Sequence, residues 1–160
     1  MSQAGLIDGL QFARGALEQR GVLGMEQLPR LAQLRCFTDR LEYVLRGGIS
    51  GYGKLCLRIS VKGEMQLVCQ RCLGLLPVPL AIDVELQLAE SLREIAEADD
   101  DVDRVLALRA MDVGELVEDE VILALPPVPK HDVCTPASMA NQAGHSPFGV
   151  LAALRRGENR

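Results

Sequence analysis

Apolar and polar residues alternate along two stretches in the middle of the chain, and this alternation predicts strands with one buried face. The clearest stretch is 54–62, where every second side chain is apolar. Its inward residues are Leu55, Leu57, Ile59 and Val61, and its outward residues are Lys54, Arg58, Ser60 and Lys62. The second stretch, 75–88, keeps the same period from Leu76 to Leu88. We therefore expect two long strands, each directing an apolar face at the core.

Shorter patterns on either side of these stretches extend the predicted sheet. The segment 34–46 also alternates, and 105–108 is predicted to form a short final strand. Gly47–Gly53 is expected to be a loop, and Gly63 is expected to turn the chain into a further strand over 64–69. Short connections of this kind favour antiparallel neighbours, so these segments predict an antiparallel meander.

Helical spacing flanks the predicted sheet. Apolar residues recur three or four positions apart from Leu6 to Leu17, which predicts an N-terminal helix that ends at Gly21. A second short helix is expected over 25–33. Asp112 and Glu115 have the spacing of a capping box, which predicts a helix over 112–125. The apolar stripe of that helix consists of Val113, Leu116, Val117, Val121, Ala124 and Leu125.

These elements predict an α+β fold. The sheet is an antiparallel β-meander, open or curled into a barrel, with an N-terminal helix and a C-terminal amphipathic helix packed on it. A chain of 160 residues suffices for one core, so we expect a single domain over 1–160, mainly β over 34–108. Its last part, 133–160, is expected to be a loop and a C-terminal tail with a short helix capped by Ser146.

The sequence Cys69-Gln-Arg-Cys72 lies between two of the predicted strands, at a hairpin corner with Gly74 just beyond it. A redox dithiol usually places its first cysteine at a helix N-terminus, whereas a metal site uses a tight turn whose backbone amides face the sulfurs. The strand context therefore favours metal. His131 and Cys134 form the other cluster with ligand spacing, and Cys69, Cys72, His131 and Cys134 would make a Cys3His zinc site. The alternative is that these are metal-free thiols at a turn, with His131 in a solvated loop.

Composition and charge narrow the function classes. Five cysteines, an odd number, argue against a disulfide framework, and Cys36 and Cys56 are interpreted as ordinary strand residues. The apolar runs are too short to span a membrane, and Met1–Gly5 lacks the start of a secretory signal, so we expect a cytoplasmic protein. The net charge is −5, with acidic residues concentrated over 90–103 and 115–120. Such a protein is less suited than a basic one to binding nucleic acid through phosphates alone.

Evidence for catalysis is weak, and we expect no enzymatic activity. Gly48–Lys54 fits the start of a phosphate-binding P-loop, but Leu55 occupies the position that requires Ser or Thr. A predicted strand follows it, so no helix N-terminus is present to hold phosphate. His145 has no neighbouring nucleophile to activate, and the carboxylates of 112–120 fit a helix cap and a solvated helix face.

Three motifs together resemble the YceD family, also called large ribosomal RNA subunit accumulation proteins. They are Leu67-Val-Cys-Gln-Arg-Cys72, Val117-Glu-Asp-Glu-Val-Ile-Leu-Ala-Leu-Pro126 followed by Val128-Pro-Lys-His-Asp132, and Ser146-Pro-Phe-Gly-Val-Leu-Ala-Ala-Leu-Arg155. The resemblance implies a non-enzymatic factor that supports the production, processing or stability of large-subunit (23S) ribosomal RNA. Other branches of the family carry further cysteines after the helix, whereas this chain has His131 and Cys134 there. Metal binding is therefore not carried over from the family.

Three functions remain open on these grounds. The first is a ribosome-assembly factor that contacts large-subunit rRNA or a pre-ribosomal particle, with a ribosomal protein as a further partner. The second is a zinc-stabilised module whose acidic surface holds a basic ribosomal protein, and the third is a thiol-disulfide enzyme. For the first, we expect RNA contacts from basic side chains beside the cysteine corner, supported by the tail. These candidates are Arg58, Lys62, Arg71, Arg155 and Arg156.

Overall fold

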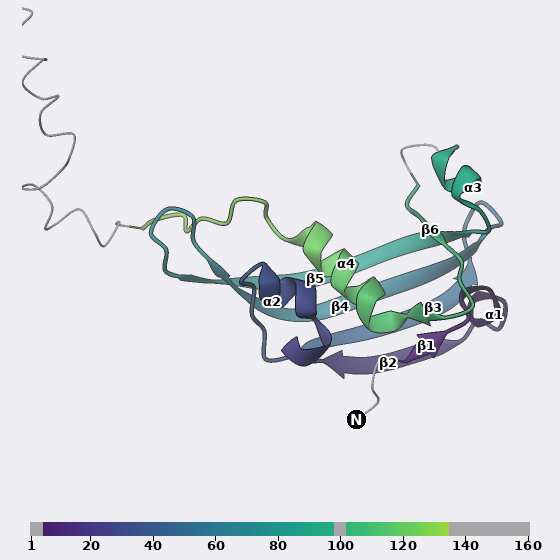
Figure 1. Cartoon of the computed structure of the whole chain (residues 1–160), viewed down its shortest axis with the longest axis horizontal. Helices are drawn as coiled ribbons and strands as arrows, with labels where there is room; N and C mark the ends of the chain where they lie inside the picture. Colours follow the sequence, from purple (N-terminus) through teal and green to yellow (C-terminus); the bar gives the residue numbers. More distant parts are fainter. Residues whose placement is uncertain (1–4, 98–101, 135–160) are drawn as a thin grey trace, which may run out of the picture.

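The computed structural model describes residues 5–97 and 102–134 (Figure 1). A five-stranded sheet has the order β2-β3-β4-β5-β6. Its strands are β2 (Glu18–Leu23), β3 (Leu41–Ile49), β4 (Leu55–Val68), β5 (Leu75–Ala89) and β6 (Arg104–Leu106). The first three pairings are antiparallel, and β6 runs parallel to β5. The predicted α+β class with an antiparallel meander is confirmed, and within the described ranges the sheet is open, with β2 and β6 at its edges.

The long β4–β5 hairpin is the centre of the sheet. Its register runs from Cys56 opposite Gln87 to Val68 opposite Leu75. The predicted inward side chains Leu57, Ile59 and Val61 are fully buried. The expected turn at Gly63 is wrong, because Gly63 lies inside β4 opposite Leu41 and Leu80. A Cβ atom there would come within 2.6 Å of Leu41 Cδ2, so the glycine permits close packing rather than a turn.

The N-terminal helix is shorter than the sequence pattern predicts. Helix α1 spans Gly9–Arg14, and the Asp8 carboxylate caps it by accepting the Gln11 N–H at 2.9 Å. The leucine at the start of the pattern lies in β1 (Leu6–Ile7), which pairs with β7 (Met111–Asp112). Gly21 does not end a helix: it lies in β2, where a Cβ would come within 2.7 Å of the Tyr43 ring.

The segment between β2 and β3 contains two short helical elements. It contains a 3-10 turn, η1 (Met25–Gln27), and helix α2 (Pro29–Gln33), which together occupy the range expected for a second helix. The strand predicted over 34–46 begins only at Leu41 and continues to Ile49, into the expected loop. Phe37, predicted to face the core, forms an isolated backbone bridge with Gln66, and its side chain is half-exposed.

Helix α4 (Val113–Ala124) packs against β4, β5 and α2 (Figure 1). Asp112 caps it by accepting the N–H groups of Gly114 and Glu115. The expected contacts Leu116, Val117 and Val121 are buried, so the predicted amphipathic helix is confirmed. Ala124, placed in the apolar stripe by its spacing, is exposed.

The acidic segment after β5 forms helix α3 (Leu92–Ala96), which Ser91 caps. Helix α3 lies on the connection between β5 and β6. Strand β6 runs parallel to β5, close to the position of the short strand predicted over 105–108. The expected C-terminal helix after Ser146, together with Arg155 and Arg156, lies outside the described residues. The single-domain organisation over 1–160 therefore stays a prediction.

Candidate metal centre

Cys69 and Cys72 lie in the turn between two strands, as the sequence predicts. Strand β4 ends at Val68 and β5 begins at Leu75. The turn between them is closed by two backbone bonds, from Cys69 N–H to Gly74 O and from Leu73 N–H to Cys69 O, both 2.9 Å long. Neither cysteine lies at a helix N-terminus. The tight turn instead leaves backbone amides facing sulfur, as a metal site requires.

The second pair of candidate ligands reaches this corner from α4. Two prolines follow Leu125, and an irregular segment arches from there to the β4–β5 turn (Figure 1). The Gln70 N–H donates to Pro129 O at 2.9 Å, and the His131 N–H points at Cys69 Sγ at 3.4 Å. These contacts join the segment 126–134 to a turn about sixty positions earlier in the sequence.

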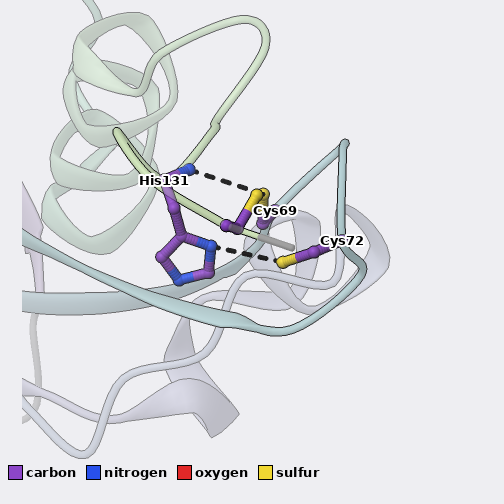
Figure 2. A group of neighbouring side chains, drawn as sticks. Cys69, Cys72 and His131 are labelled. Carbon is purple, nitrogen blue, oxygen red and sulfur yellow. Dashed lines mark hydrogen bonds between the residues drawn. The ribbon is translucent and has the colours of Figure 1, made fainter. Parts of the chain in front are cut away.

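The structure brings all four predicted ligands together. One ligand atom from each of Cys69, Cys72, His131 and Cys134 lies within 4.8 Å of the others. Cys69 Sγ is 3.9 Å from Cys134 Sγ, and Cys72 Sγ is 3.3 Å from His131 Nδ1 (Figure 2). Two sulfurs bound tetrahedrally to zinc at about 2.3 Å would lie roughly 3.8 Å apart. The group could therefore hold a metal ion, and its three sulfurs and one imidazole suit zinc.

Backbone amides favour a thiolate at Cys69. The Cys72 N–H, assisted by those of His131 and Arg71, lowers the pKa of Cys69 to about 5, although burial acts in the opposite direction. At Cys72 the Gly74 N–H also lowers the pKa, but burial and the sulfurs of Cys69 and Cys134 outweigh it and raise the pKa overall. The turn thus favours the thiolate form of Cys69, which is the form that binds metal.

The Leu75 carbonyl and the Arg71 side chain make further contacts with the four ligands. The Leu75 carbonyl accepts a bond from His131 Nε2 at 3.0 Å. The Arg71 side chain donates to Cys134 Sγ at 2.9 Å and to the His131 carbonyl at 2.8 Å. Sequence reasoning missed both contacts. Arg71 lies between the two cysteines in the sequence, and this position could have indicated that its side chain contacts the site. The contact of the Leu75 carbonyl could not have been predicted, because every residue has a backbone carbonyl.

The two remaining cysteines are buried away from this group. Burial raises the pKa of both thiols. Cys56 lies in β4, as predicted, but Cys36 lies between α2 and β3 and not in a strand. Both are free thiols, and the interpretation as ordinary strand residues holds for Cys56 alone.

The predicted RNA contacts lie in different surroundings. Arg58 and Lys62 are exposed on the outward face of β4, where Arg58 pairs with Glu85 at 2.8 Å. Lys62 lies opposite Glu42 on β3. Arg71 instead bonds the candidate ligands. The outward face of β2–β5 is therefore mixed in charge, with basic residues Arg20, Arg46, Arg58 and Lys62 and acidic residues Glu18, Glu42, Glu64, Asp83 and Glu85.

Comparison with known proteins gives one family. The model of the family described as "Large ribosomal RNA subunit accumulation protein YceD" matches residues 57–154, more than half of the chain. The matched range includes most of β4, all of β5 and α4, and all four candidate ligands. No solved structure matches the chain. None of the helices in the described ranges is both long and apolar enough to span a bilayer.

Proposed function

The chain belongs to the family of large ribosomal RNA subunit accumulation proteins (YceD), and from that premise we propose that it supports synthesis, processing or stability of 23S rRNA during ribosome assembly. It acts in the cytoplasm as a binding factor, without catalysing a reaction. The family match carries this proposal, because it covers most of the central β4–β5 hairpin, the packed helix α4 and the cysteine corner together.

The test of this function is the balance between the two rRNAs. Depletion of the protein should lower mature large-subunit rRNA relative to small-subunit rRNA, with precursor fragments accumulating. The balance is measured by quantifying both rRNAs and their unprocessed ends after depletion, with re-expression of the native chain as the control. Unchanged ratios and ends at complete depletion would contradict the proposal.

The cysteine corner is proposed to hold zinc as a structural ion. Its four donors are those of a Cys3His site, and the 3.9 Å between Cys69 Sγ and Cys134 Sγ is close to the separation of two sulfurs bound to one zinc ion. Bound zinc would supply four strong bonds between the β4–β5 turn and the segment 126–134. Elemental analysis of protein purified without chelator tests this, and less than about a tenth of an equivalent of zinc would leave the residues as inert thiols.

The RNA-contact surface is proposed to include Arg58 and Lys62 on β4, with Arg155 and Arg156 in support. Basic side chains on a rigid sheet suit phosphate binding, although Glu85 competes for Arg58. Replacing both Arg58 and Lys62 by Glu should lower the large-subunit rRNA level in a complementation strain. Arg93→Glu, on the exposed α3, is the matched charge control. Normal rRNA ratios with the double variant at normal abundance would exclude this surface.

A second candidate is an acidic module that holds a basic ribosomal protein. The net charge of −5 and the acidic residues on the outward sheet face support this alternative. Crosslinking in growing cells, followed by RNA sequencing and protein identification, distinguishes the two. Direct RNA binding should weaken steeply with added salt on naked RNA, whereas the acidic module should recover a basic protein and ignore naked RNA.

A further inference from the structure

Arg71 lies between the two cysteines of the turn, and its side chain is turned onto the opposite half of the corner. Its Nε donates to Cys134 Sγ at 2.9 Å. Its Nη2 donates to the carbonyls of His131 and Asp132, at 2.8 and 3.3 Å. The planar Arg71 guanidinium therefore bonds the sulfur of one candidate ligand, Cys134, and the backbone carbonyl of another, His131. These bonds connect positions about sixty residues apart in the sequence.

The net charge of the site also favours the contact between Arg71 and Cys134 Sγ. Three thiolates and a neutral imidazole around a divalent ion leave one surplus negative charge, and Arg71 supplies one positive charge directly at a sulfur. Charge-assisted bonds of this kind are stronger than neutral ones. A planar fork with several donors can also serve a sulfur and two carbonyls together, which a lysine ammonium on a flexible stem cannot do in the same geometry.

The imidazole of His131 is oriented by a second outer contact. The Leu75 carbonyl can only accept a hydrogen bond, so His131 Nε2 carries the proton. Nδ1 is then unprotonated and faces Cys72 Sγ at 3.3 Å (Figure 2). Metal-bound histidines commonly donate their other ring N–H to a carbonyl in this way, which fixes the tautomer and the ring orientation.

We propose that Arg71 is a positioning residue of the metal centre, which holds the segment 131–134 against the β4–β5 turn and offsets the thiolate charge, while His131 binds through Nδ1. This inference rests on the proposed zinc centre. It assigns Arg71 to the corner itself rather than to an RNA phosphate, because Nε and Nη2 are both engaged there.

The test compares zinc release from the full-length, zinc-loaded native chain with that from Arg71→Gln and Arg71→Lys. Release is followed with a coloured chelator in excess, and Arg58→Gln serves as the matched control from the neighbouring sheet face. Loss of an outer contact typically costs about 10–100-fold in metal affinity, so Arg71→Gln should release zinc roughly that much faster. Arg71→Lys should lie between Arg71→Gln and the native chain, and Arg58→Gln should match the native chain.

Cobalt substitution separates a role at the sulfur from a general loss of structure. The thiolate-to-cobalt absorption of Arg71→Gln should keep its intensity, because three thiolates still bind, but should move to longer wavelength once the sulfur loses its bond. Nitrogen NMR of the zinc-loaded chain should show His131 protonated at Nε2. The melting temperature of the metal-free variant should equal that of the metal-free native chain, since Arg71 is exposed.

Each outcome decides a different point. Equal zinc release from the native chain and Arg71→Gln would overturn the role of Arg71 while leaving the zinc centre intact. A His131 that is bound through Nε2 would overturn the assignment of the ligand atom. A native chain that takes up no zinc when supplied with it would overturn both the zinc centre and this inference, and the proposed role in rRNA accumulation would stand apart from either result.

Discussion

The packed interior beneath α4 and the cysteine corner at the end of the same hairpin are held together in different ways. In the interior, side chains such as Leu57, Ile59 and Val117 are completely buried and apolar. In the corner, Cys69 is fully buried, but Leu73 and Leu75 are 75% and 67% exposed. The interior is therefore stabilised by the removal of apolar surface from water, whereas the corner has little such surface to remove.

The corner depends on polar contacts between two segments. The Gln70 N–H bonds the Pro129 carbonyl, and Arg71 bonds the backbone at His131. A neutral bond such as that of Gln70 adds only about 0.5–1.5 kcal/mol, because water competes for the same groups, and solvent screens the exposed charge of Arg71. The comparison indicates a sheet that folds without metal and a corner that needs four ligand bonds to be ordered.

Removing apolar packing from the interior should have the largest effect on stability. Leu116→Ala empties a buried aliphatic site under α4, and we expect it to lower the free energy of unfolding by about 2–4 kcal/mol. Leu123→Ala is the matched control, because it removes the same atoms from a position on α4 that is 78% exposed. Urea unfolding measures both. Equal stability of the two variants would mean that α4 does not pack through Leu116.

The buried carboxylate of Glu118 is the polar exception within this interior. It accepts the N–H groups of Arg30 and Leu31 at 2.8 and 3.0 Å, and the Arg30 side chain at 2.8 Å. It thereby caps the N-terminus of α2 and joins that helix to α4. Glu118→Gln keeps the size but loses the charge, and should cost roughly 1–3 kcal/mol in the same urea experiment. Exposed Glu115→Gln is its control, and an equal result for both would refute the link.

Removal of metal should loosen the cysteine corner and leave the sheet folded. After chelation, we expect the amides of Gln70 and His131 to exchange hydrogen faster, because their acceptors lie across the two segments. The amide of Ile59, in the middle of the central hairpin, should keep its protection. Hydrogen exchange followed by mass spectrometry measures both regions at once. If chelation exposed β4 as well, the two regions would form one cooperative unit and the comparison would fail.

The parts that could be predicted from the sequence are those with local signals. Alternation located the strands that became β4 and β5, and Asp112 with its apolar stripe located α4. The spacing of the cysteine pair and of His131 and Cys134 indicated one site, because two short pairs each fit a metal ligand pattern.

The errors have a common physical cause. Gly63 and Gly21 suggested a turn and a helix end, but each serves a close contact with a neighbouring strand, at Leu41 and Tyr43. Single-sequence periodicity carries no information on such contacts. The same limit applies to Arg71 and Glu118, whose partners lie 63 and 88 residues away.

Glu120 allows the smallest and most specific test of the interior. It is buried on α4, and burial, with help from the charges of Asp103 and Asp119, raises its pKa. A carboxyl group whose pKa is higher in the folded state destabilises the fold at neutral pH, and this penalty is relieved as the pH falls through the folded pKa. Glu120→Gln should therefore raise the free energy of unfolding at pH 7, by roughly 0.5–1 kcal/mol. The gain over the native chain should shrink as the pH approaches the ordinary carboxyl range, as urea unfolding at pH 7 and pH 5 can measure. Since Glu118→Gln is expected to act in the opposite direction at pH 7, a loss of stability in both variants would show that Glu120 has a partner that offsets its burial.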